Sequence, residues 1–335
     1  MATCPRSKPL KSFTHISATS VDEAVAALQT HGQGAHVMAG GQDLLFRIKK
    51  YIVQPTCIVD LKTIGGMNSI AVGSDGGLKI GALATLTEIA TSPEIKTHYA
   101  VLAEAAASVA SPQIRNLGTL GGNICQDVWC WYLQDGFSCW KSGGKFCDLA
   151  AGDSRYYGSV MGGHLCLSNH PSDVAPALAA LDARVLTASP RGQRSVPILE
   201  FLSGHQWAGT RLQCHSLEPD EIVTAIEAPF RPTRSHYLKF ALRKSWDFAI
   251  ASAAVAVDME DGICKEARVV LGGVATYPFR STEAESLLCG KEIDDPLAEE
   301  AGRIALQGAR PLRMNGYKVD LGRLLVRRAL LAVAH

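Results

Sequence analysis

RNLGTLGGN, at residues 115–123, places three glycines within five consecutive positions. Glycines at this density let the backbone approach something flat or charged, and the Asn and Thr side chains of the loop can donate and accept hydrogen bonds. The loop differs from the dinucleotide fingerprint G-x-G-x-x-G, and the sequence has no P-loop. It therefore indicates close backbone contact with a ligand without identifying that ligand.

AGGQDLL, at residues 39–45, is a second glycine loop. It lies between an apolar strand expected at 36–39 and a helix expected at 44–50, where backbone N–H groups and the helix dipole attract anions. A tight strand–helix turn explains this loop equally well. Two such loops in one chain nevertheless favour a shared, phosphate-rich cofactor.

The elements next to these loops alternate between helix and strand. A helix is expected at 21–30, with Ser20 and Glu23 forming a capping box, and a buried strand at 56–61. This alternation predicts a small parallel α/β unit. Further elements are expected as a strand at 78–83, a helix at 101–110, a helix at 173–181 and a strand at 184–187.

The last third of the sequence has a different pattern, that of an antiparallel sheet followed by helices, which makes an α+β module. Pro229 and Pro232 interrupt the preceding pattern and place a domain boundary near 227–233. The expected strands are 237–242, 251–259 and 267–271, with a hairpin turn at Asp261-Gly262, and the expected helices are 281–288, 296–307 and 320–332.

Five of the ten cysteines fall within residues 124–169, a stretch without clear periodicity that is typical of an insertion. Four thiolates can hold a [4Fe–4S] cluster or a tetrahedral zinc ion, and the spacing does not choose between them because it lacks C-x2-C pairs. Five unligated thiols are the third alternative. We expect the aromatic residues of this stretch to form an apolar shell around the cysteines. The cysteines are Cys125, Cys130, Cys139, Cys147 and Cys166, and the aromatic residues are Trp129, Trp131, Tyr132, Phe137 and Trp140.

The short segment HPSD, at residues 170–173, has two interpretations. Ser172 is a plausible N-cap for the helix that follows. Alternatively, Ser172 and Asp173 contact the cofactor.

The bulk composition excludes several classes of protein. The chain has 335 residues, 47% of them hydrophobic, and a net charge of +1, which allows a large core and does not suggest a nucleic-acid surface. The N-terminal segment MATCPRSKPLKSF lacks the apolar region of a secretory signal, and apolar runs such as 249–257 are too short to span a bilayer. We therefore expect a cytoplasmic protein without a membrane span, although export with a signal-bearing partner stays open.

Four blocks of sequence together resemble the FAD-binding subunits of the xanthine dehydrogenase family of molybdenum hydroxylases. The resemblance implies an α+β fold in which a PCMH-type FAD-binding domain, built of two α/β subdomains, occupies residues 1–228 and contains the Cys-rich insertion at about 124–169. A domain similar to the C-terminal domain of the CO dehydrogenase flavoprotein follows at 229–335. Gln42 stands where the commoner family form has Thr. The four blocks are AGGQDLL (39–45), RNLGTLGGN (115–123), HPSDVAPALAALDA (170–183) and LGGVATYPFR (271–280).

The resemblance also implies where FAD binds. The first glycine loop would hold the pyrophosphate, the second loop and the Ser-Asp pair would lie along the cofactor, and residues 243–248 would lie near the flavin ring. The implied FAD-binding residues are Ala39, Gly40, Gly41, Gln42, Asp43, Leu44, Leu45, Asn116, Gly118, Thr119, Gly122, Asn123, Ser172, Asp173, Lys239, Arg243 and Asp247.

The cysteine insertion resembles only part of that family, namely the β subunits of 4-hydroxybenzoyl-CoA reductases and the FAD subunits of periplasmic aldehyde oxidoreductases. Four cysteines of the insertion bind a [4Fe–4S] cluster in those proteins. The resemblance implies that Cys130, Cys139, Cys147 and Cys166 are the ligands here and that Cys125 is not one.

The implied function is electron transfer by an oxidoreductase subunit. We expect no catalytic residue on this chain, because the substrate would react at a molybdenum cofactor on a large subunit. Electrons would pass between that subunit, the [2Fe–2S] clusters of a small subunit, this FAD and an external electron donor or acceptor, in an assembly expected to be a dimer of heterotrimers. The alternatives are a standalone PCMH-type flavin oxidase and a zinc-stabilised binding module without a redox role.

Overall fold

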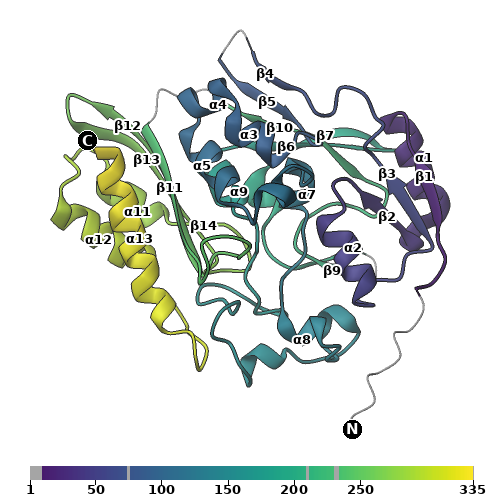
Figure 1. Ribbon diagram of the computed structural model, residues 1–335. Helices are drawn as coiled ribbons and strands as arrows, with labels where there is room; N and C mark the ends of the chain where they lie inside the picture. Colours follow the sequence, from purple (N-terminus) through teal and green to yellow (C-terminus); the bar gives the residue numbers. More distant parts are fainter. Residues whose placement is uncertain (1–9, 74–75, 209–210, 230–233, 335) are drawn as a thin grey trace.

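A computed structural model describes residues 10–73, 76–208, 211–229 and 234–334 of the chain. Three sheets organise these residues, and a fourth, of two short strands, lies beside the insertion (Figure 1). Part of the expected domain boundary, at 230–233 and including Pro232, falls outside the described residues.

The first sheet is small and entirely parallel, as the helix–strand alternation predicts. Ser20 caps the first helix by accepting a hydrogen bond from the backbone N–H of Glu23, so the expected helix start is confirmed. The expected capping box is only half formed, because the Glu23 carboxylate accepts from the backbone N–H of Thr19 at 2.7 Å and not from that of Ser20. Apolar residues such as Ala24 and Leu28 recur at helical spacing and bury the inner face of that helix. The strands, in the order β1-β3-β2, are β1 (Thr14–Ser17), β3 (Cys57–Asp60) and β2 (Ala35–Met38), and the helices are α1 (Val21–His31) and α2 (Gln42–Lys49).

The second sheet is antiparallel throughout, with its central strand supplied by a segment far along the sequence. Its order is β4-β5-β10-β6-β7, and helices cover one face of it. The strand expected at 184–187 is the start of a hairpin that the sequence did not indicate. The strands are β4 (Ile70–Val72), β5 (Leu78–Gly81), β10 (Ile222–Ala228), β6 (Arg184–Ser189) and β7 (Gly192–Pro197). The helices are α3 (Leu86–Thr91), α4 (Pro93–His98), α5 (Ala100–Ser108), α6 (Pro112–Arg115), α7 (Leu120–Ile124), α9 (Val174–Ala180) and α10 (Ile198–Phe201).

The insertion between α7 and α9 is mostly irregular chain, as its lack of periodicity predicts. It projects below the second sheet and lies beside the C-terminal part of the molecule (Figure 1). Its regular elements are one short α-helix and two single 3-10 turns, and the paired strands β8 and β9 pack next to it. These elements are α8 (Trp131–Gln134), η2 (Trp140–Ser142), η3 (Asp148–Ala150), β8 (Gln206–Ala208) and β9 (Arg211–Gln213).

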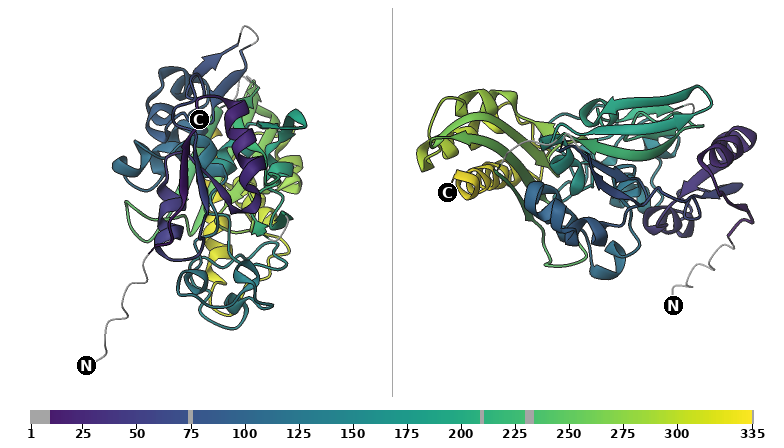
Figure 2. Two further views of the ribbon diagram at one scale, coloured as in Figure 1. Left: turned by 90° about the vertical axis from the view of Figure 1, so that its right-hand side faces the viewer. Right: turned by 90° about the horizontal axis from the view of Figure 1, so that it is seen from above.

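The C-terminal part is the expected antiparallel sheet followed by helices. Asp261 and Gly262 form the hairpin turn with φ angles of +53° and +81°, a conformation that suits Asp-Gly. The helices cover one face of the sheet, while α5 and α9 of the preceding part lie against the other (Figures 1 and 2). The elements are β11 (Arg234–Phe240), β12 (Ala251–Glu260), β13 (Ile263–Gly272), β14 (Phe279–Arg280), α11 (Thr282–Leu288), α12 (Asp295–Ala305) and α13 (Tyr317–Ala334).

Strand β12 connects the two hydrophobic cores. Side chains alternate across a strand, so Ala254 and Ala256 pack into the core of the first part while Val255 and Val257 pack into the core under the C-terminal helices. The two parts therefore share this sheet as a common layer.

Candidate functional site

A groove of about 1150 Å³ runs between the first sheet, the second sheet with its helices and the loop that follows β11. A groove of this size exceeds most small-ligand pockets and suits an extended cofactor. Residues 39–45 all line it, so the whole first glycine loop faces this space.

The two glycine loops contact each other at Gly40. A Cβ added to Gly40 would lie 1.9 Å from the carbonyl oxygen of Leu117, so only glycine allows the loops to approach this closely. Gly41 is the N-cap of α2 with a φ of +72°, which also favours glycine. The first turn of α2 thus begins at the groove, where its N-terminus attracts an anion.

The second glycine loop faces the same groove through four of the five residues predicted for it. Gly118, Thr119, Gly122 and Asn123 line the groove, and the Thr119 hydroxyl caps α7 by accepting from the backbone N–H of Gly122 at 3.2 Å. Asn116 does not line the groove, because its Oδ1 accepts a hydrogen bond of 2.6 Å from the Thr87 hydroxyl.

In the HPSD segment, Ser172 bonds to the start of the helix that follows, and Asp173 faces the groove. The Ser172 hydroxyl accepts from the backbone N–H of Ala175 in the first turn of α9 at 3.0 Å, and it donates to Oδ1 of Asn123 at 2.5 Å, which positions a groove residue. Ser172 itself is buried and lies behind the groove wall. Asp173 lines the groove directly.

Asp173 joins the part built on the second sheet to the C-terminal part. Its carboxylate accepts from the Tyr237 hydroxyl at 3.0 Å and from Nζ of Lys239 at 2.7 Å. Burial raises the pKa of Asp173, against the opposing effect of the Lys239 ammonium. Lys239 also donates to the carbonyl of Asp247 at 2.9 Å, so it supports the groove without lining it.

The loop after β11 forms one end of the groove. Arg243 and Asp247, two of the residues that the resemblance implies for FAD, line it, and so do Trp246 and Phe248. The backbone N–H of Arg243 donates to the Asp247 carboxylate at 3.1 Å, which closes the loop on itself.

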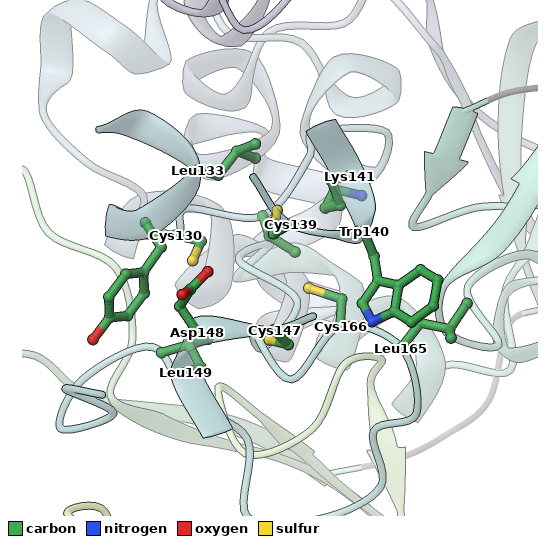
Figure 3. A pocket seen from close by; sticks show the side chains of 12 residues that line it. Cys130, Leu133, Cys139, Trp140, Lys141, Cys147, Asp148, Leu149, Leu165 and Cys166 are labelled. Carbon is green, nitrogen blue, oxygen red and sulfur yellow. The ribbon is translucent and has the colours of Figure 1, made fainter. Parts of the chain in front are cut away.

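A second, smaller pocket of about 10 Å³ lies in the insertion, and the four cysteines predicted as cluster ligands all line it (Figure 3). Cys130, Cys139 and Cys147 each occupy the N-cap position of a short helix, and Cys166 reaches the pocket from irregular chain. A hydrogen bond from the Cys166 thiol lowers the pKa of Cys147 to about 6. Cys125 lies apart from them and lines the large groove.

The aromatic shell expected around these cysteines is only partly present. Tyr132 and Trp140 line the pocket together with leucines. Trp131 and Phe137 are exposed on the surface. Trp129 faces the large groove, where its ring centroid lies 4.6 Å from that of Phe46 and 5.2 Å from that of Phe248. Within the described part of the chain, no three His, Cys, Asp or Glu side chains are grouped closely enough to hold one metal ion.

A buried group of charges lies where the groove meets the insertion, and the sequence analysis did not identify it. Asp127 accepts from Nη2 of Arg47 at 2.7 Å and from Nζ of Lys141 at 2.8 Å. Burial opposes ionisation of Asp127, but the two cations outweigh it and hold the pKa of this carboxyl well below its usual range. The one sequence signal for this group was Lys141 inside a cysteine-rich loop, and the sequence does not show that Lys141 is buried or that it pairs with Asp127.

Family comparisons agree with this architecture. The family of the FAD binding domain in molybdopterin dehydrogenase matches residues 11–129 and 141–231, and the family of the CO dehydrogenase flavoprotein C-terminal domain matches residues 236–333. Residues 130–140, which include Cys130 and Cys139, lie between the matched segments of the first family.

Individual relatives align over nearly the whole chain. The aldehyde oxidoreductase FAD-binding subunit PaoB of Escherichia coli is 34% identical over 97% of this chain and 98% of its own. The carbon monoxide dehydrogenase medium chain of Afipia carboxidovorans is 29% identical over 95% of this chain and 96% of its own. Quinoline 2-oxidoreductase from Pseudomonas putida superposes with a TM-score of 0.77 at 25% identity, covering 98% of both chains. No helix among the residues that the structure describes has the length and apolar character needed to cross a membrane.

Proposed function

The chain belongs to the FAD-binding medium subunits of the molybdenum hydroxylase family, and we propose that it transfers electrons by means of FAD in the large groove and a [4Fe–4S] cluster in the cysteine pocket. The [4Fe–4S] cluster is supported by the position of four cysteines, which come from separate parts of the insertion and line one pocket: Cys130, Cys139, Cys147 and Cys166.

The residues present fit FAD. Gly40 allows the two glycine loops to meet at the groove, Gly41 adopts the φ of +72° at the N-cap of α2, and the first turn of α2 offers a positive dipole to a pyrophosphate. Asn123, Asp173, Arg243 and Asp247 would supply polar contacts along the remaining length of the groove, with Asn116, Ser172 and Lys239 supporting them from behind.

The cysteine pocket offers the donor set of an iron–sulfur cluster. Four thiols are the usual ligands of [4Fe–4S], and Leu133, Leu149 and Trp140 give the apolar surroundings that protect such a group from solvent. Bound FAD supplies one- and two-electron chemistry and a bound cluster supplies one-electron chemistry, whereas this chain binds and orients both.

The proposal includes partners. We place this chain beside a large subunit with a molybdenum cofactor and a small subunit with [2Fe–2S] clusters, in a dimer of heterotrimers that exchanges electrons with an external donor or acceptor. The family membership and the medium-chain relatives support the three-subunit part. The substrate would react on the large subunit, and the cytoplasmic location stays a prediction.

The test is metal and flavin analysis of protein purified without oxygen. We expect about four iron atoms and one FAD per chain, with iron lost in serine variants of any of the four pocket cysteines and retained in Cys125→Ser. Acid denaturation should release all of the flavin. Zinc in place of iron would support the zinc-stabilised module, and full iron in Cys130→Ser with loss in Cys125→Ser would show that the first ligand is misassigned.

A further inference from the structure

The groove and the cysteine pocket share a wall that is one backbone thick. Residues 127–130 are irregular chain in which successive residues face opposite sites: Asp127 and Trp129 line the groove, whereas Val128 and Cys130 line the cysteine pocket. The two sites are therefore built on opposite sides of the same four residues.

Lys141 lines both sites and crosses this wall. It follows Cys139 by two residues in η2 and lies at the edge of the cysteine pocket (Figure 3). Its side chain is only 3% exposed, and its ammonium donates to Oδ1 of Asp127 at 2.8 Å and to the carbonyl oxygen of Leu212 at 2.5 Å. A lysine with both contacts buried is held in one position.

The contacts continue from Asp127 to the first glycine loop. Oδ2 of Asp127 accepts from Nη2 of Arg47, which lies on α2, and Nη1 of Arg47 is 3.9 Å from the carboxylate of Asp43 in the first turn of that helix. The backbone N–H of Asp127 also points toward Asp43, at 3.4 Å from its carboxylate oxygen. An unbroken series of charged contacts thus leads from the segment that carries Cys139 to α2, whose N-cap is Gly41.

We propose that Lys141 is a positioning residue that couples the two sites, so that a cluster bound by the cysteines fixes α2 and its glycine loop for FAD. The inference rests on the proposed function, because it requires a group that orders the loop around Cys139. When Lys141 is fixed by the ordered loop, it holds Asp127, and Asp127 holds Arg47 and the start of α2. Typical coupling between two binding sites changes affinity by about 5- to 150-fold.

The experiment measures the FAD dissociation constant of the full chain by flavin fluorescence, with iron content and thermal unfolding determined for every variant. Cys147→Ser, which should remove the cluster, is expected to weaken FAD binding by roughly tenfold. Lys141→Met should weaken it to a similar extent while retaining iron. Combining the two substitutions should add little, since contacts in one series do not act independently. Lys145→Met, at an exposed lysine of the same loop, is the matched control and should leave both iron and FAD affinity unchanged.

A second variant keeps the proposal testable if Lys141→Met does not fold. Arg47→Gln interrupts the same contacts from the groove side, where Arg47 is 20% exposed, and Cys147→Ser should no longer change FAD affinity in that background. The proposal is overturned if Lys141→Met binds FAD as the unaltered chain does, or if the effects of Lys141→Met and Cys147→Ser add in full. Unaltered protein without iron would overturn the cluster assignment itself and the coupling with it, which distinguishes the two failures.

Discussion

Gly40 and Gly41 show how single residues decide whether a cofactor site exists. The carbonyl oxygen of Leu117 occupies the place where a Gly40 side chain would begin, and Gly41 adopts a φ of +72° at the N-cap of α2. The closeness of the two glycine loops is therefore a consequence of missing Cβ atoms. Both glycine loops were recognisable in the sequence, although the contact between the two loops was not.

Gly41→Val is expected to abolish most FAD binding. The valine would combine a disfavoured backbone conformation with a side chain among the groups that face the groove. Gly32→Ala is the control, because Gly32 ends α1 in open space and its loss should cost about 1 kcal/mol of stability without removing FAD. FAD per chain after gel filtration measures the difference, and equal flavin content in the two variants would contradict the assignment of this loop.

Lys318 is a buried lysine that acts through its three hydrogen bonds to carbonyl oxygens. It lies on α13, is fully buried, and donates to Tyr156 and Gly158 of the insertion at 3.0 Å each and to Gly273 at 2.6 Å. Lys318→Met should lower the free energy of unfolding by roughly 2–4 kcal/mol, because it removes three buried hydrogen bonds. Urea denaturation measures the loss. Lys265→Met removes an exposed ion pair and should change stability by less than about 0.5 kcal/mol; a similarly small effect of Lys318→Met would refute the role.

At the scale of elements, local sequence patterns predicted the helices and hairpins that form from contacts between residues close in sequence. The capped helix α1 and the β12–β13 hairpin follow from a capping Ser and an Asp-Gly turn, and both are present as expected. The antiparallel second sheet was not predictable in this way, because its central strand β10 pairs with β5 across most of the FAD domain. Hydrophobic patterns give the strands but do not give partners that are distant in sequence.

The site was predictable to the same limit. Glycine loops and clustered cysteines carry their chemistry in residue type and spacing, and the structure places them in two adjoining pockets. The direction of Trp129 and the pairing of Lys141 with Asp127 depend on whether each side chain of residues 127–130 faces the groove or the cysteine pocket. The composition of the insertion predicted Trp129 beside the cysteines, and this was wrong because Trp129 faces the groove.

The irregular insertion has little regular structure to hold its backbone in place. Its helices are too short to be stable alone, and ordering its backbone costs about 1–2 kcal/mol per residue, which bonds between metal and thiolate would offset. A serine variant that lacks the cluster should therefore be cleaved by protease within 126–168 before any other site, whereas Cys125→Ser should resist as the unaltered chain does. Mass spectrometry of the first fragments tests this, and first cuts elsewhere would argue against the role of metal in ordering the segment.

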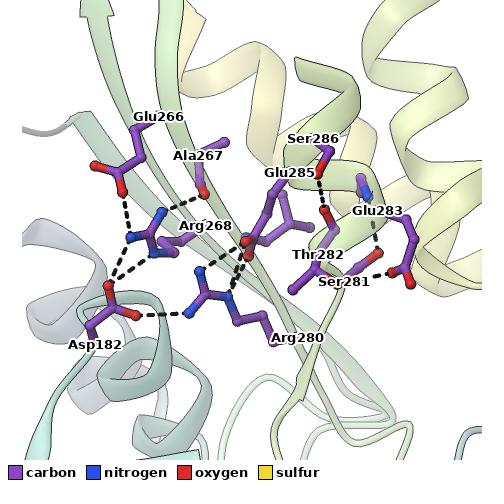
Figure 4. A network of polar contacts seen from close by, with 12 residues as sticks. Asp182, Glu266, Ala267, Arg268, Arg280, Ser281, Thr282, Glu283, Glu285 and Ser286 are labelled. Carbon is purple, nitrogen blue, oxygen red and sulfur yellow. Dashed lines mark hydrogen bonds and ion pairs between the residues drawn. The ribbon is translucent and has the colours of Figure 1, made fainter. Parts of the chain in front are cut away.

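At the scale of the whole molecule, two parts with separate cores meet along the sheet of β11 to β14. Asp182, just beyond α9, accepts from Arg268 of β13 and from Arg280 of β14, and both arginines also pair with glutamates of the C-terminal part (Figure 4). The groove needs this arrangement, because its glycine loops belong to one part and residues 243–248 belong to the other. The shape of the groove therefore depends on how the two parts are positioned relative to each other.

Asp182→Ala should loosen this junction and weaken FAD binding at a distance. The substitution removes a carboxylate shared by Arg268 and Arg280, for which we expect a loss of about 1–3 kcal/mol in unfolding free energy. Because Glu266 and Glu285 still pair with the arginines, each part should remain folded, and calorimetry should show the single transition broaden or divide. Glu300→Ala, which breaks an exposed ion pair within α12, is the control and should alter neither stability nor the FAD dissociation constant appreciably. If Asp182→Ala lowers stability while FAD affinity is unchanged, the junction serves the fold alone and the groove does not depend on it.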